Sequence, residues 1–271
     1  MVNEALEREY NNRAKVPDFP AIAEALGRAA AAFRAAHPDR ELGVSYGPSA
    51  RQALDIFWPA TGRAAPLAIF LHGGYWQSLD RAWFSHLAAG LTARGVGVAM
   101  PSYELCPTVT LAALVEQVRA AGAFLHRRHG RRMTAFGHSA GGHLTAMLMA
   151  TDWTARGLPA GMIAAGLSIS GLFDLVPLTE TTINDALRLD AAEARRLSPL
   201  LLPSPGLPLH AVVGGAEGAE YERQSRCMAE AWGGTWEVVP GANHFTVFAP
   251  LADAETAMVG RLARLAGAAD D

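Results

Sequence analysis

Residues 137–141 read GHSAG, which is the G-x-S-x-G spacing of a nucleophilic serine. The apolar residues 133–136 before this motif predict a strand, and residues 143–149 after it predict a helix. A sharp turn between a strand and a helix exposes the serine hydroxyl, and small neighbouring residues allow the chain to make that turn. The motif predicts that Ser139 is the nucleophile of an acyl-transfer reaction, the alternative being a glycine-rich turn without chemistry.

A second motif, HGGYW at residues 72–76, directly follows the apolar run 69–71. Gly73 and Gly74 have no Cβ, so their backbone N–H groups are free to point toward a reacting oxygen. The residue after a nucleophilic serine, here Ala140, usually supplies a second N–H group. We expect Gly73 or Gly74 to form an oxyanion hole with Ala140, in which each donor is worth about 3 to 4 kcal/mol.

A serine hydroxyl needs a base, and His244 is the best placed of the nine histidines. It follows the last predicted strand, and in folds with this serine motif the order along the chain is serine, acid, histidine. The acid is expected after the strand at residues 209–213, in a loop that contains no aspartate. Glu217 is the predicted acid, with Glu220 as its rival.

The composition excludes several other function classes. The formal net charge is −3, with both signs spread along the chain, so we expect neither nucleic acid nor a membrane as a partner. The charged N-terminus has no secretory core, and no apolar run approaches the roughly 20 residues that span a bilayer, which favours the cytoplasm. Two cysteines are too few for a disulfide framework. No ligand spacing predicts a metal, and no cofactor is expected.

Alternating strand and helix patterns predict a mainly parallel sheet with helices on both faces, entered through two antiparallel strands. We expect one domain over residues 1–271, with an N-terminal helical arm at about 1–38. The irregular stretch at about 172–208 predicts a small helical lid over the site, the alternative being a surface excursion. Strands are predicted at 42–46, 53–58, 67–71, 96–100, 133–136, 163–170, 209–213 and 235–239, and helices at 79–94, 110–128 and 251–265.

Together, HGGYW at 72–76 and GHSAGGH at 137–143 resemble kynurenine formamidase (arylformamidase) of the α/β-hydrolase superfamily, a branch close to the hormone-sensitive-lipase-like esterases. The segments EYNNR (9–13), LDIFWP (54–59) and EYERQS (220–225) are similar to that branch as well. The chain departs from it at the acid, where the family usually has aspartate and this sequence has Glu217. The resemblance implies the α/β-hydrolase fold and hydrolysis of N-formyl-L-kynurenine to L-kynurenine and formate.

The expected partner is therefore a small molecule, an aromatic formamide or ester. Tyr75, Trp76 and Tyr103 are candidates to stack on its ring, with filling of the core as the alternative, and His72 and His138 are further candidate contacts. A short-chain carboxylesterase of broad specificity is the second hypothesis. A binding protein without catalysis is the third, although such a protein has no use for an intact serine, histidine and oxyanion loop. The sequence leaves open whether the protein forms a homodimer.

Overall fold

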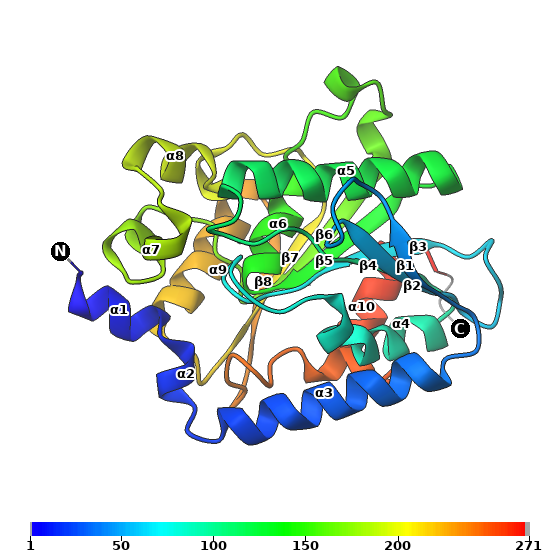
Figure 1. The fold of residues 1–271 in the computed structure, drawn as a ribbon, viewed down its shortest axis with the longest axis horizontal. Helices are drawn as coiled ribbons and strands as arrows, with labels where there is room; N and C mark the ends of the chain where they lie inside the picture. Colours follow the sequence, from blue (N-terminus) through cyan, green and yellow to red (C-terminus); the bar gives the residue numbers. More distant parts are fainter. Residues whose placement is uncertain (1, 269–271) are drawn as a thin grey trace.

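A sheet of eight strands in the order β1-β2-β4-β3-β5-β6-β7-β8 lies at the centre of the computed structural model, which describes residues 2–268 (Figure 1). Strand β2 pairs antiparallel with β1 and β4, and the remaining pairs are parallel. The predicted antiparallel start and parallel body of the sheet are therefore confirmed. The strands are β1 (Arg40–Ser45), β2 (Ala53–Phe57), β3 (Leu67–Leu71), β4 (Gly97–Pro101), β5 (Met133–His138), β6 (Ile163–Ile169), β7 (Leu209–Gly214) and β8 (Thr235–Val239).

Helices cover both faces of this sheet, as the alternating pattern predicts (Figure 1). The strands β3, β5 and β7 are buried along their whole length, which explains their continuous apolar runs. None of the described helices combines the length and the hydrophobicity that crossing a membrane requires. One face carries α5 (Leu111–His129), α6 (Ala140–Met149) and α9 (Ala219–Trp232), and the other carries the 3-10 helix η1 (Arg81–Ala88), α4 (Ala89–Ala93) and α10 (Ala257–Leu265).

Two of the predicted helices are divided in the structure. The helix expected at 79–94 begins as η1, which Asp80 caps, and continues as α4. The prediction of one helix at 251–265 is wrong for its first turns, because the 3-10 helix η6 (Ala249–Ala252) ends before α10 begins. The division follows from Thr256, whose side chain accepts a hydrogen bond from the Val259 N–H and so caps a new helix.

The N-terminal arm contains α1 (Glu4–Tyr10), α2 (Asn12–Lys15) and α3 (Phe19–Ala36), and α3 packs along η1. The segment 172–208 is inserted between β6 and β7. It contains η4 (Pro177–Glu180), α7 (Asn184–Leu187), α8 (Ala191–Arg196) and η5 (Pro199–Leu201). Two short 3-10 helices, η2 (Thr154–Arg156) and η3 (Ala160–Met162), precede β6. Met1 and residues 269–271, which the predicted arm and domain limits include, lie outside the described residues.

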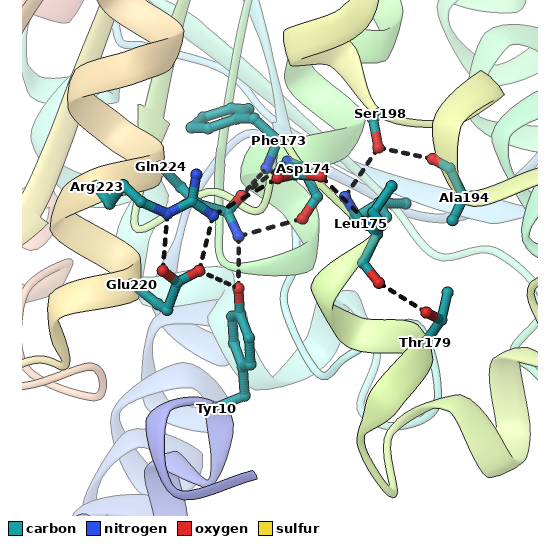
Figure 2. A network of polar contacts seen from close by, with 11 residues as sticks. Tyr10, Phe173, Asp174, Leu175, Thr179, Ala194, Ser198, Glu220, Arg223 and Gln224 are labelled. Atoms are coloured by element: carbon teal, nitrogen blue, oxygen red, sulfur yellow. Dashed lines mark hydrogen bonds and ion pairs between the residues drawn. The ribbon is translucent and has the colours of Figure 1, made fainter. Parts of the chain in front are cut away.

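A buried tyrosine attaches this arm to the rest of the fold (Figure 2). The Tyr10 hydroxyl donates to Oε2 of Glu220 at 2.7 Å and accepts from Nε2 of Gln224 at 2.8 Å. Gln224 in turn accepts from the backbone N–H groups of Phe173 and Asp174, at the start of the inserted segment. One hydroxyl therefore connects the arm, α9 and the insertion.

Replacing Tyr10 by phenylalanine should lower the free energy of unfolding by about 1–3 kcal/mol, because Gln224 and Glu220 lose a buried partner. Urea unfolding followed by circular dichroism measures this change. Arg8→Gln on the same helix is the control, since its ion pair with Glu4 is solvent-exposed and contributes about 0–1 kcal/mol. An equal effect of both substitutions would contradict a role for the hydroxyl.

Candidate active site

Ser139 lies at the predicted turn between β5 and α6, with φ 56° and ψ −120°. A positive φ is strained for a residue with a side chain, so the surrounding chain must hold it. The Ser139 N–H donates to the carbonyl of Ile169 on β6 at 2.8 Å, and the Ser139 carbonyl accepts from the N–H of Gly142 at 2.8 Å. The neighbouring strand and the first turn of α6 therefore fix the backbone of the serine.

Gly141, the last residue of the serine motif, permits this turn by close approach. A Cβ on Gly141 would lie only 1.9 Å from the carbonyl oxygen of Leu71, at the end of β3. The start of α6 can therefore pack directly on the end of β3 only without a side chain at this position. This contact brings the HGGYW loop, which follows β3, beside Ser139.

That loop supplies backbone donors at the serine. A Cβ on Gly73 would lie 3.2 Å from Cβ of Ser139, and Gly74 adopts φ 111°, a conformation that favours glycine. Both glycines line the same cavity as Ser139. Ala140 is the first residue of α6, where a backbone N–H has no partner within the helix and the helix dipole is positive. These groups form a candidate oxyanion hole.

His244 follows β8 and contacts Glu217, which follows β7. The Nδ1 atom of His244 lies 2.5 Å from Oε2 of Glu217, and these side chains are 5% and 0% exposed. An ionised carboxylate only accepts hydrogen bonds, so Nδ1 carries the hydrogen and Nε2 is left to take a proton. His244 and Ser139 line the same cavity, so the base and the hydroxyl face one space.

The second carboxylate oxygen of Glu217 is also occupied. Oε1 accepts from the Ser170 hydroxyl at 2.5 Å and from the Gly214 N–H at 2.7 Å. These bonds compensate the burial of a charge and fix the orientation of the carboxylate. The sequence prediction did not include Ser170, which follows β6 with φ 49°; its place at a strand end was the available signal.

Glu220, the rival acid, contacts Tyr10 and Arg223 (Figure 2). It lies in the first turn of α9 and accepts from Nε and Nη2 of Arg223 at 2.7 and 2.8 Å, and from the Tyr10 hydroxyl. The Arg223 hydrogen bonds lower the pKa of Glu220 despite its partial burial. The structure thus brings Glu217 to the imidazole and uses Glu220 to attach the arm.

His138 precedes the serine, and its ring centroid lies 4.6 Å from that of His244. Burial, with a smaller contribution from His244, lowers the pKa of His138 well below its ordinary value. A neutral His138 adds no positive charge beside an imidazole that must accept a proton.

A cavity of about 600 Å³ opens at Ser139. Ser139 and His244 line it, together with aromatic side chains from several parts of the chain. Residues of the arm also line it, as do Thr182 and Ile183 of the inserted segment. The aromatic residues that line it are Tyr10, Phe19, Tyr75, Trp83, Phe84, Phe245 and Phe248.

Two of the five predicted substrate contacts, Tyr75 and His138, line this cavity. The other three are buried behind its wall. The rings of His72 and Tyr103 stack at 4.3 Å between centroids, and Trp76 is fully buried against the edge of His143. The backbone turns through positive φ at both Tyr75 and Trp76, and Trp76 enters the core. Their packing gives these three side chains a structural role.

The cavity thus combines a hydroxyl, an imidazole held by a carboxylate, and backbone donors. A set of this kind has the parts that acyl transfer through an acyl-serine requires. Across residues 2–268 there is no group of three or more His, Cys, Asp or Glu side chains arranged to hold a metal ion.

Known proteins share this arrangement of the chain. A family model described as BD-FAE matches residues 54–185. The sequence is 31% identical over 241 residues to the kynurenine formamidase of Salmo salar, and the match covers 83% of this chain and 82% of that protein. The crystal structure of a candidate thioesterase from Silicibacter sp. aligns with a TM-score of 0.88 at 34% identity, covering 94% of this chain and 97% of that one.

A hormone-sensitive lipase from a metagenome library shares the fold, with a TM-score of 0.70 at 20% identity over 90% of this chain and 91% of the lipase. These superpositions, together with the sheet order, confirm the α/β-hydrolase fold predicted from the sequence.

Replacing Glu217 by glutamine should reduce kcat/KM by roughly a thousandfold or more, because an amide neither holds the productive tautomer of His244 nor stabilises its charged form. Glu220→Gln is the matched control. It should reduce stability through the lost Arg223 pair but reduce kcat/KM far less. Steady-state kinetics on the folded fraction of each variant measures both effects. A greater loss of activity in the Glu220 variant would place the acid at that residue.

Proposed function

The chain belongs to the kynurenine formamidase family of the α/β-hydrolases, and we propose that it hydrolyses N-formyl-L-kynurenine to L-kynurenine and formate. The protein is a hydrolase that acts on a small molecule. The likeness to the Salmo salar formamidase across 83% of the chain carries the proposal. An aromatic cavity at Ser139 supports it, because the leaving amine of this substrate is an aryl amine.

In the first half of the reaction, His244 removes the proton of Ser139 as the hydroxyl oxygen attacks the formyl carbon. The carbonyl oxygen becomes an oxyanion, which accepts hydrogen bonds from Ala140 and from Gly73 or Gly74. Glu217 keeps His244 in the tautomer with Nδ1 protonated and stabilises the imidazolium. His244 then donates the proton to the amine nitrogen, the C–N bond breaks, and a formyl-serine remains.

In the second half, water replaces the departed amine. His244 removes a proton from this water as its oxygen attacks the formyl carbon of the ester. The same backbone donors hold the second oxyanion. Collapse returns the proton to the Ser139 oxygen and releases formate, so that water is the only co-substrate consumed.

The wall of the cavity suits the leaving group. Tyr75, Phe245 and Phe248 present aromatic surface, and an aryl ring stacks favourably on such surface as it leaves water. We further propose that residues 172–208 act as a lid, since Thr182 and Ile183 close one side of the cavity. The cytoplasm is the proposed location.

An ester hydrolase is the second candidate, because the Silicibacter relative is described as a candidate thioesterase. The purified protein should cleave N-formyl-L-kynurenine with a kcat/KM well above that for a short p-nitrophenyl ester. Absorbance of the released kynurenine and of p-nitrophenolate measures the two reactions. Rapid turnover of the ester without cleavage of the formamide would overturn the formamidase proposal.

Replacing Ser139 by alanine should reduce kcat/KM by at least about a thousandfold, since no nucleophile remains. The fold should persist, because alanine keeps the Cβ and the backbone bonds of residue 139 are unchanged. Activity assays and circular dichroism measure these two results. A chelator should leave the parent rate unchanged, and a folded alanine variant with near-parent activity would exclude the serine mechanism.

A further inference from the structure

The N-terminal arm places two charged side chains of opposite sign at the catalytic cavity. Among residues 2–268, Glu7 and Arg13 line the cavity, and no other Asp, Glu, Lys or Arg does. They lie on α1 and α2, more than 120 residues before Ser139 in the sequence. The proposed chemistry uses neither of them.

Arg13 is held at the cavity by its surroundings. The buried side chain of the preceding residue, Asn12, donates to the hydroxyls of Tyr221 at 2.7 Å and Tyr75 at 3.2 Å. The guanidinium of Arg13 lies over the ring of Phe19, 5.1 Å from its centroid. Within the described chain Arg13 has no acidic partner, so its charge is available to a ligand.

Glu7 is positioned by the inserted segment. Its carboxylate accepts from the backbone N–H of Thr182 at 2.9 Å and from the Thr182 hydroxyl at 2.7 Å. These donors are neutral, and residues 2–268 provide Glu7 with no cationic partner. Its negative charge is therefore oriented but not neutralised.

We propose that Glu7 and Arg13 form a subsite for the α-amino acid end of the substrate, with Arg13 binding the carboxylate and Glu7 the ammonium group. This inference rests on the proposed function. In N-formyl-L-kynurenine the formamide and the amino acid tail are attached to the same ring. Glu7 and Arg13 line the same cavity as Ser139, so this subsite would receive the tail when the formyl group lies at Ser139. A guanidinium matches a carboxylate in geometry and charge.

Four aryl formamides with the same ring and the same ortho ketone separate the two charges. N-formyl-L-kynurenine carries both, 4-(2-formamidophenyl)-4-oxobutanoic acid carries the carboxylate, N-formylkynuramine carries the ammonium group, and N-(2-acetylphenyl)formamide carries neither. The measured quantity is kcat/KM for each charged substrate divided by kcat/KM for the neutral one. Because the reacting group is the same, this ratio isolates recognition of the tail.

Arg13→Gln should lower the ratio for the carboxylate-bearing substrates about tenfold, mainly through KM, since a charge-assisted contact is lost. Arg13→Lys should retain part of the preference. Glu7→Gln should lower the ratio for the ammonium-bearing substrates several-fold, and its amide oxygen still accepts from Thr182. Arg8→Gln and Glu4→Gln, on exposed positions of the same arm, are the matched controls and should leave all ratios unchanged.

The possible results separate the two proposals. A parent protein that cleaves none of the four formamides overturns the proposed function. A parent protein that cleaves them, with ratios that neither Arg13→Gln nor Glu7→Gln alters, overturns the subsite alone. Ratios that fall equally in the control variants also overturn it, because they would indicate a general effect of arm charge. Circular dichroism of each variant verifies folding, and the two independent positions keep the test valid if one variant unfolds.

Discussion

The register of the parallel strands is the constraint on which the candidate site depends. Leu71 pairs with Gly137, His138 with Ile169, and Ile169 with Val212, so β3, β5, β6 and β7 end at one level. The oxyanion loop, the serine, Ser170, the acid and the histidine each follow one of these strands or β8. A slip of one residue in any pair would turn its side chains to the other face and separate groups that must meet within hydrogen-bond distance. The continuous burial of these strands makes such a slip costly.

The second constraint is the burial of charge at this edge. A buried carboxylate is tolerated only where donors replace water, and Glu217 has three: Ser170, Gly214 and His244. Burial lowers the pKa of the neighbouring His138 well below its ordinary value, so this imidazole stays neutral beside His244. The strained φ of Ser139 is held by the same bonds that connect β5 to β6.

Local patterns were enough to predict the fold. A strand that is buried on both faces of a parallel sheet is largely apolar, so each strand can be predicted from its own residues. The family could be predicted from the motifs HGGYW and GHSAGGH because each of them is also a local pattern. What could not be predicted depends on distant contacts. The sequence favours Glu217 over Glu220 only by its place in the loop. The structure separates them because α9 begins at Ala219 and Glu220 contacts Tyr10, 210 residues away. Trp76 follows Tyr75, which lines the cavity, in the sequence. The positive φ of both residues turns the backbone so that the Trp76 side chain enters the core instead.

Chemistry and recognition are placed on different parts of this molecule. The reacting groups follow rigid strands, where they are desolvated and accurately positioned, whereas the arm and the inserted segment form the outer wall. Charges at that wall remain near water, so Arg13 needs no buried partner of the kind that Glu217 requires. The two regions are joined by Tyr75, whose hydroxyl bonds to Tyr221 and to the Tyr10 carbonyl while its backbone continues from the oxyanion loop. A change in how the arm docks would therefore be transmitted through Tyr75 to the loop that is proposed to hold the oxyanion.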